Sequence, residues 1–314
     1  MKIISWKSII IKKSDKISLK QNQLCVTTLE KEALFSLNDL NCIILENNYT
    51  FITTQILAKL VTNDVFIIIC DDKYDPVGIT LSLNQHWQPL LVFEKQFNFT
   101  ENEKLILKTE IIKYKLKNTL LVMQTLKCRE KSIETIERFI KTLAFGDETN
   151  REGLVAKVFF RELYGSNFIR FSDDGINNAL NYGYKILTGA ISRTISKYGL
   201  NNYLGLFHIG KTNPYNLACD FIEPLRPLVD YWVTKNIETI TEHVSYDHRL
   251  KLIDYLLNSK VIINKKYVTI TKAIDYMIRS YITVLNENNT NKLELPVLDF
   301  NPIKEENSDE QDEI

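Results

Sequence analysis

Residues 71–78 read Asp-Asp-Lys-Tyr-Asp-Pro-Val-Gly, a polar run with a proline and a glycine, and the chain changes character across it. Before this run, the apolar residues form short stretches rich in Ile, Val and Thr, which is typical of strands. From about Asn98 onward they recur at helical spacing. The run therefore predicts a boundary between a β part and a helical part, which together make an α+β fold.

The part before the boundary, residues 1–75, predicts a β-sandwich-like domain. Turn-forming clusters at residues 37–39 and 46–48 separate short apolar runs, and one helix is expected at residues 53–61. Strand edges and apolar residues such as Trp6 and Ile10 offer a surface for dimerisation. The expected strands are residues 2–12, 24–28, 42–46 and 65–70.

The part after the boundary predicts a linker at residues 76–97 and a mainly α-helical catalytic domain at residues 98–300. Residues 301–314 carry six acids against Lys304 and almost nothing apolar, which predicts a disordered acidic tail. After a first helix that follows Asn98, the expected helices are residues 133–144, 148–164, 173–198, 214–235, 248–257 and 271–286.

Net charge and composition limit the kinds of protein and partner that are possible. The net charge of the 314 residues is zero, but the chain without its tail holds 38 bases and 33 acids, so a basic patch for nucleic acid is possible. The longest apolar run, residues 65–70, is too short to cross a bilayer. Five scattered cysteines without a CxxC pair fit free thiols in a reducing cytoplasm.

Glu152 is the first candidate for chemistry. In the expected helix at residues 148–164, it shares a face with Val155, Phe159 and Leu163, which places a carboxylate on the apolar side. A buried carboxylate is costly unless it is paired or binds a metal. Metal binding and a salt bridge to a core arginine such as Arg193 remain equally open from this pattern.

His208 is the second candidate, in an apolar segment between Gly205 and Gly210. A lone histidine in such a segment is more often a core residue than a ligand, although histidine is the commonest metal-binding side chain.

Asp220 and Glu223 form the third candidate, because residues three apart share one face of a helix. Pro224 and Pro227 follow within the same helical pattern and remove the hydrogen bonds that the carbonyls of the two acids would accept. A kink beside two acids is typical of a working site. The alternative is a structural ion-pair network with Arg226.

Two carboxylates and one imidazole would make a site for Mg²⁺ or Mn²⁺, with the imidazole favouring Mn²⁺. A metal of this kind on a basic protein suits phosphodiester chemistry.

Four blocks of the sequence resemble one known family, the CRISPR-associated integrases of spacer acquisition. The residues of these blocks are most similar to those of type II systems. One departure is Phe207, where the family often has a first histidine; His208 matches the second, metal-binding one. The blocks are residues 151–160 against "REG-A-K-YF", 178–187 against "NA-LNYGY-IL", 204–208 against "LGIHH" and 216–227 against "NLA-DLMEPFRP".

This resemblance implies a prokaryotic, cytoplasmic enzyme of antiviral defence. A 3′-hydroxyl of a short DNA fragment would attack the repeat boundary of the CRISPR array in a transesterification. Glu152, His208 and Glu223 would be the catalytic metal ligands, and Asp220 would support them. Tyr182 and Lys211 are candidate DNA contacts.

The resemblance also implies partners. The chain would form a homodimer, and two such dimers would flank a dimer of a small ferredoxin-like CRISPR-associated protein, with other type II CRISPR proteins as further candidates. Two other functions stay open: a metal-dependent endonuclease that cuts branched or damaged DNA with water as nucleophile, and a DNA-binding scaffold without activity.

Overall fold

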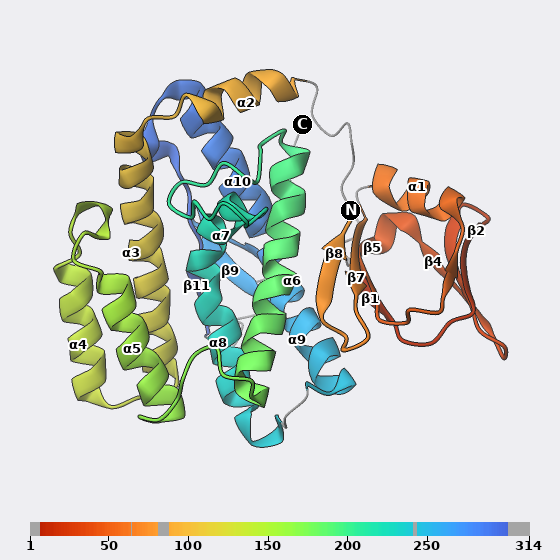
Figure 1. Cartoon of the computed structure of the whole chain (residues 1–314), viewed down its shortest axis with the longest axis horizontal. Helices are drawn as coiled ribbons and strands as arrows, with labels where there is room; N and C mark the ends of the chain where they lie inside the picture. The colour runs from red at the N-terminus through yellow and green to blue at the C-terminus, as the bar shows by residue number, and fades with distance from the viewer. Residues whose placement is uncertain (1–6, 64, 81–87, 241–243, 301–314) are drawn as a thin grey trace.

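The computed structural model describes residues 7–63, 65–80, 88–240 and 244–300 of the chain. A β-rich part stands beside a larger helical part that begins at Pro89 (Figure 1). The expected α+β class is confirmed, because strands come first and helices follow. Within the described ranges, no helix is long and apolar enough to span a membrane.

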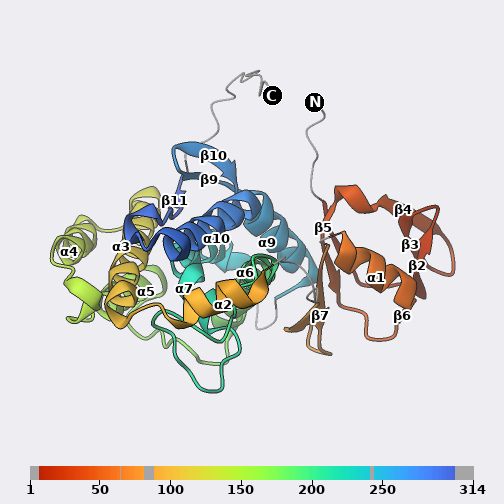
Figure 2. The ribbon, with the colours of Figure 1, turned by 90° about the horizontal axis from the view of Figure 1, so that it is seen from above.

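Two four-stranded sheets form the β-rich part. The strands are β1 Lys7–Ile11, β2 Lys16–Lys20, β3 Gln23–Thr27, β4 Glu32–Ser36, β5 Leu40–Leu45, β6 Phe51–Ile52, β7 Phe66–Cys70 and β8 Pro76–Ile79. One sheet has the order β1-β5-β7-β8, in which only β8 is antiparallel to its neighbour. The other has the order β4-β3-β2-β6, in which only the β2–β6 pair is parallel. Helix α1, Thr54–Thr62, lies between the sheets (Figure 2).

The side chains of β5 and β7 alternate between two cores. Ile43 and Ile67 point between the sheets and pack with Ile56 of α1 in a small core. Their neighbours Ile44 and Ile68 point the other way, into the main core of the helical part. Since successive side chains of a strand face opposite sides, a strand buried on both sides needs a continuous apolar run. These runs are the ones that the sequence predicts as strands, and the sandwich-like packing is confirmed.

Strands β2 and β4 are not among the expected strands. In β2 only Ile17 is fully buried, and lysines at both ends shorten its apolar pattern. A two-residue turn joins β2 to β3, and its residues Gln21 and Asn22 have φ values of +50° and +58°. Two positive φ angles are the geometry of a type I′ hairpin turn. The hairpin thus depends on turn geometry more than on apolar periodicity.

The stretch predicted as a linker, residues 76–97, holds regular structure at both ends. Residues 76–79 form β8 on the edge of the first sheet, and Pro89–Phe97 forms helix α2. Regular structure can begin at both places because a proline is tolerated at the start of an edge strand and at the first position of a helix. The domain boundaries themselves stay a prediction, and the acidic tail lies outside the described residues.

A buried ion pair joins the two parts. Helix α9, Tyr246–Asn258, carries Arg249, whose Nε lies 2.6 Å from Oε1 of Glu46 at the end of β5. Both side chains are almost fully buried, and the guanidinium also lies 4.3 Å from the ring centre of Tyr74. Ile10 is partly buried and packs against the main core as well, so only part of its side chain is left for the expected dimer surface, which stays a prediction. Trp6 lies outside the described residues.

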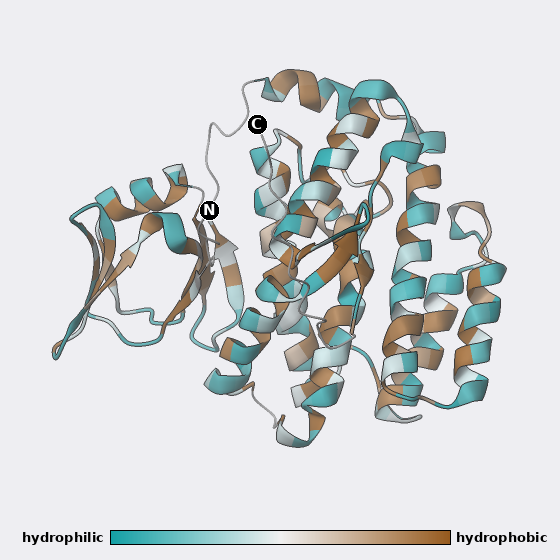
Figure 3. Cartoon of the chain, turned by 180° about the vertical axis from the view of Figure 1, so that it is seen from behind, coloured by the Kyte–Doolittle hydropathy of each residue, from teal (hydrophilic) through white to brown (hydrophobic). Residues whose placement is uncertain are grey.

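The predicted helices appear within a few residues of their expected ends. Their bounds are α3 Glu101–Thr125, α4 Glu130–Lys141, α5 Arg151–Tyr164, α6 Gly175–Lys197, α9 as given and α10 Ile270–Glu287. Hydrophilic and hydrophobic residues alternate along these helices, and a group of hydrophobic residues lies in the middle of the helical part (Figure 3).

The expected helix at residues 214–235 is divided into α7 Asn216–Ile222, a 3₁₀ turn η3 Glu223–Leu225 and α8 Arg226–Lys235. The predicted break at the prolines is therefore confirmed. The N–H of Glu223 donates to the carbonyl of Asp220, and the N–H of Arg226 donates to the carbonyl of Glu223. Bonds over three residues align side chains three apart, so these three charged residues lie along one edge of the turn.

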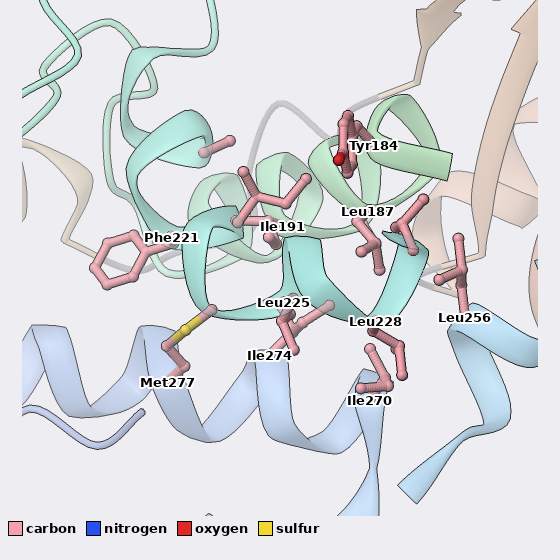
Figure 4. Packing of buried hydrophobic residues seen from close by; sticks show 14 of the residues in the cluster. Tyr184, Leu187, Ile191, Phe221, Leu225, Leu228, Leu256, Ile270, Ile274 and Met277 are labelled. Atoms are coloured by element: carbon pink, nitrogen blue, oxygen red, sulfur yellow. The ribbon is translucent and has the colours of Figure 1, made fainter. Parts of the chain in front are cut away.

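Helices α6, α7, α8 and α10 meet in the main core. Figure 4 shows Leu187 and Ile191 of α6 facing the α7–α8 segment, with Ile274 of α10 on the other side of it. Gly183 permits the close approach of α6 and α8, because a Cβ there would lie 2.6 Å from Cγ1 of Val229. The turn that carries Glu223 is thus packed on several sides.

A short sheet that the sequence did not predict completes the helical part. It has the order β10-β9-β11, with β9 Lys260–Ile263, β10 Lys266–Thr269 and β11 Val297–Leu298. The buried side chain of Asn118 on α3 accepts a hydrogen bond from the N–H of Leu298 at 3.1 Å. The same side chain donates to the carbonyls of Pro224 at 2.7 Å and Pro296 at 3.0 Å. Asn118 therefore fastens η3 to both α3 and β11.

Candidate active site

Glu152 lies in the first turn of α5, with a side chain that is 29% exposed. Asn150 caps the helix and accepts a hydrogen bond from the N–H of Gly153 at 3.2 Å. The buried carboxylate of Asp147 accepts from the N–H of Glu152 at 3.1 Å. Val155 on the same face is buried, as the sequence predicts. Two side-chain caps therefore fix the turn that presents Glu152.

His208 is held by Asp220. The fully buried Asp220 accepts hydrogen bonds from the N–H groups of Leu206 and His208, the latter at 2.9 Å. Its Oδ1 also lies 2.7 Å from Nδ1 of His208. Burial raises the pKa of Asp220, and the bonds from His208 and the backbone act against that rise. With Nδ1 engaged, Nε2 of His208 lies 3.9 Å from Oε1 of Glu223.

Gly205 makes this loop possible. A Cβ at Gly205 would lie 2.1 Å from the carbonyl oxygen of His208 and 3.0 Å from Oδ2 of Asp220. No side chain fits at that distance, so the glycine of the third sequence block is required by the close approach of backbone to backbone.

Lys115 on α3 connects the two other predicted ligands. Its ammonium forms ion pairs with Oε1 of Glu152 and, at 2.5 Å, with Oε2 of Glu223. The alternative partner considered for Glu152, Arg193, lies elsewhere, with its guanidinium 5.5 Å from the ring centre of Phe66. The structure thus brings the two carboxylates to one point, with a positive charge between them.

Burial and ion pairing have opposite effects on the pKa values of Glu223 and Lys115. Burial opposes ionisation of Glu223, but Lys115 and Arg226 outweigh it and hold the pKa of the carboxyl below its usual value. Burial likewise opposes the charge on Lys115, but Glu223 and Glu152 together raise its pKa. Nε of Arg226 lies 3.1 Å from Oε1 of Glu223. The group is a compact network of charges in which Glu223 is buried and Lys115, Glu152 and Arg226 are partly exposed.

The donor set fits a divalent cation. As the side chains stand, no three His, Cys, Asp or Glu residues in the described part of the chain are arranged around a metal position, and Lys115 lies between the carboxylates. Yet Oε2 of Glu223 is buried and, apart from its ion pair with Lys115, has no hydrogen-bond partner among the described residues. A buried carboxylate oxygen needs such partners. Two carboxylates that already share one cation, with an imidazole nitrogen nearby, are suitable ligands for Mg²⁺ or Mn²⁺.

A hollow of about 460 Å³ opens beside this network. A second hollow of about 370 Å³ adjoins it and shares Arg170, Phe171, Tyr184 and Arg226 with it. Positive side chains outnumber carboxylates around the first hollow. Those cations are Lys115, Lys157, Arg161, Arg170 and Arg226, against Glu152 and Asp230.

Phe171 stands at the junction of the two hollows and is 85% exposed. Its φ of +84° is strained for a residue with a side chain. Its N–H donates to Oδ1 of the buried Asn177 at 3.2 Å, and Arg170 donates to the same oxygen at 2.7 Å. The loop therefore holds an aromatic ring in solvent next to an arginine.

The two predicted DNA contacts differ in position. Lys211 is exposed in the loop after His208, so a phosphate can reach it, and its role stays a prediction. Tyr182 is 2% exposed and lines a cavity of about 760 Å³ between the β-rich and helical parts. Its hydroxyl has no hydrogen-bond partner among the described residues. This burial argues against a contact with duplex DNA.

Lys115 and Asn118 belong to the site, although no motif points to them. Ile111, Lys115, Asn118 and Val122 form one stripe of α3 at helical spacing, and all except Lys115 are fully buried. A lysine and an asparagine in an apolar stripe need partners. The two polar residues that interrupt this apolar stripe are therefore the sequence feature that could have indicated them.

The chain matches the family model of the CRISPR associated protein Cas1 over residues 9–165 and 167–266. A CRISPR-associated endonuclease Cas1 of Neisseria meningitidis serogroup C (strain 8013) is 32% identical over 312 residues, covering 96% of this chain and 99% of the relative. The expected likeness to type II systems is consistent with this relative.

Two solved structures share the fold at low sequence identity. A partial Cas6-RT-Cas1–Cas2 complex matches with a TM-score of 0.64 and 15% identity, over 92% of this chain and 98% of that one. A casposase bound to integration product matches with a TM-score of 0.64 and 20% identity, over 90% of this chain and 91% of that one. The family match and the Neisseria relative extend over most of the sequence, and the chain therefore belongs to the Cas1 family of CRISPR-associated proteins.

Proposed function

We propose that this chain is a metal-dependent DNA integrase of CRISPR adaptation, which joins the 3′-hydroxyl of a short DNA fragment to the repeat array by transesterification. The observation that carries the proposal is the meeting of Glu152 and Glu223 at Lys115, with Nε2 of His208 beside Glu223. These are the three ligands expected from the sequence blocks.

The residues of the site have separate tasks in this reaction. Glu152, His208 and Glu223 would hold a divalent cation, which supplies a Lewis acid for the phosphate and a charge that stabilises the leaving oxygen. Asp220 keeps Nδ1 of His208 engaged, so that Nε2 remains available as a ligand. Arg226, beside Glu223 and on the wall of the hollow, is placed to bind a phosphate oxygen.

DNA is the proposed substrate because the hollow beside the ligands is cationic and partly aromatic. Lys157, Arg161 and Arg170 suit a phosphate backbone. The exposed ring of Phe171 is a surface on which an unpaired base can stack. The combination favours a strand end that is single-stranded when it reaches the carboxylates.

A homodimer and a Cas2-like partner are proposed on two grounds. One of the solved structures that share this fold is a complex of Cas1 with Cas2. Leu29, Tyr49 and Phe51 are largely exposed at one end of the second sheet, where Thr27 and Phe51 both align with Lys16. Exposed apolar residues gathered in this way are typical of a protein interface. Light scattering that gives the mass of a single chain at micromolar concentration would contradict the dimer.

A DNA endonuclease is the second candidate, and the Neisseria relative is named a CRISPR-associated endonuclease. The same carboxylates and histidine would serve, with water in place of the 3′-hydroxyl.

Incubation of a labelled DNA fragment with a supercoiled repeat plasmid and Mn²⁺ separates the two candidates. An integrase, supplied with the Cas2-like partner, joins the label to the plasmid and relaxes it. A nuclease gives cut products without joined label. Activity that persists after chelation of divalent metal would contradict both.

A further inference from the structure

Lys115 occupies the point at which the two carboxylates of the site meet. Its ammonium forms ion pairs with both Glu152 and Glu223, and its side chain is only 16% exposed. Glu223 is more deeply buried still, with 3% of its side chain exposed. The lysine therefore neutralises one carboxylate that is shielded from solvent, Glu223, and a second, Glu152, that is only partly exposed.

Removal of that positive charge would have a definite cost. Two buried carboxylates that approach each other repel, and one of them tends to take up a proton. A buried charge left without its partner is strongly destabilising. The ammonium thus stabilises the two ionised carboxylates in the same place and in the same sense as a bound divalent cation would.

We propose that Lys115 is an internal counter-cation that competes with the divalent metal for Glu152 and Glu223, and that it transfers to a DNA phosphate when the metal binds. This inference rests on the proposed metal site. Two cations cannot bind the same carboxylate oxygens without mutual repulsion, so the metal must displace the ammonium.

A DNA phosphate in the neighbouring hollow would be the anionic destination of the displaced ammonium. Lys115 also lines the hollow of about 460 Å³, together with Arg170 and Arg226. A phosphate bound there would accept the ammonium, and so would reduce the cost of releasing it from the carboxylates. Metal and DNA would then bind with positive coupling, which by linkage acts equally in both directions.

The test measures Mn²⁺ binding, by the electron paramagnetic resonance of free Mn²⁺ at pH 8, for the full chain, for K115M and for K113M. Lys113 is the matched control, because it lies on the same helix and pairs with Glu110 at the surface. K115M is expected to bind Mn²⁺ about tenfold more tightly than the wild-type chain, which corresponds to about 1.4 kcal/mol. K113M is expected to match the wild type.

A second measurement adds a single-stranded oligonucleotide. The affinity of the wild-type chain for Mn²⁺ should rise severalfold, whereas that of K115M should not change. Without metal, K115M should melt at a lower temperature than the wild type, and Mn²⁺ should raise its melting temperature more. If K115M does not fold, K115Q replaces it, because the amide keeps a hydrogen-bond donor without the charge.

Two results would contradict the proposal, and they have different consequences for the proposed function. Weaker or unchanged Mn²⁺ binding by K115M, beside normal binding by the wild type, would overturn the exchange and leave the proposed function standing. No Mn²⁺ binding by the wild-type chain would overturn the metal site and the exchange together.

Discussion

The side-chain amide of Asn118 donates to the carbonyl of Pro224 at 2.7 Å and so fastens the long helix α3 to the turn that carries Glu223. Asn118→Ala leaves this carbonyl, that of Pro296 and the N–H of Leu298 without their partner. Each buried group left unsatisfied costs about 1–3 kcal/mol, so we expect a loss of several kcal/mol in the free energy of unfolding, measured in urea. Asn102→Ala, at an exposed position of the same helix, is the control. Equal stability of the two variants would show that the amide bonds are dispensable.

Loss of any one ligand should remove strand transfer without unfolding the chain. Glu152→Gln, His208→Ala and Glu223→Gln are each expected to lower the rate by about a thousandfold, which corresponds to about 4 kcal/mol of activation free energy. The rate of label joining at limiting Mn²⁺ measures this effect, and circular dichroism checks the fold. A variant that retains near-normal joining is not a ligand.

Gly205→Ala should act through geometry. The added Cβ would lie 2.1 Å from the carbonyl oxygen of His208, so the loop must move and His208 must leave Asp220. We expect loss of strand transfer with most of the helical content retained. Gly210→Ala is the matched control in the same loop, because its Cβ would lie 3.4 Å from the nearest atom. Similar activity in the two variants would contradict the role given to the close approach.

Glu46→Gln should destabilise the interface between the β-rich and helical parts. It leaves Arg249 buried without its carboxylate, and breaking one side of a buried ion pair costs about 3–5 kcal/mol. The measurement is the urea midpoint. Glu32→Gln, in the exposed pair with Lys20, should leave the midpoint unchanged. A stable Glu46→Gln chain would mean that this ion pair is not needed to hold the two parts together.

The sequence predicts the parts of this molecule that depend on periodicity. Strands buried on both sides, such as β5 and β7, show continuous apolar runs, and the long helices show their spacing. Hairpins such as β2–β3 depend on the left-handed conformations of Gln21 and Asn22, which composition does not indicate. The short strand β11 depends on a side chain from α3, about 180 residues away.

The candidate site likewise contains residues that the sequence predicts and residues that it does not. Glu152, His208, Asp220 and Glu223 lie in blocks that resemble the Cas1 family, so the sequence indicates them. Lys115 is joined to them only by tertiary packing, and no local pattern ties a lysine on α3 to a carboxylate on η3.

Asp230 should make stability depend on pH. It is buried, it accepts a hydrogen bond from the hydroxyl of Tyr184, and burial raises its pKa to about 6. An unfolded aspartate has a pKa of about 3.9, so between these values the folded chain binds more protons than the unfolded chain. Its contribution is therefore fully present below pH about 4 and is lost as the pH rises through about 6.

Asp230→Asn keeps an acceptor for Tyr184 but cannot ionise. From pH 4 to pH 7, the free energy of unfolding of the wild-type chain should thus fall by about 3 kcal/mol relative to that of Asp230→Asn, at about 1.4 kcal/mol per pKa unit. Urea denaturation at intervals across this range measures the difference, and Asp254→Asn at an exposed position of α9 is the control. Parallel curves for the wild type and Asp230→Asn would show that the carboxyl group ionises in the folded chain as easily as in the unfolded one, through solvent access or a compensating positive charge.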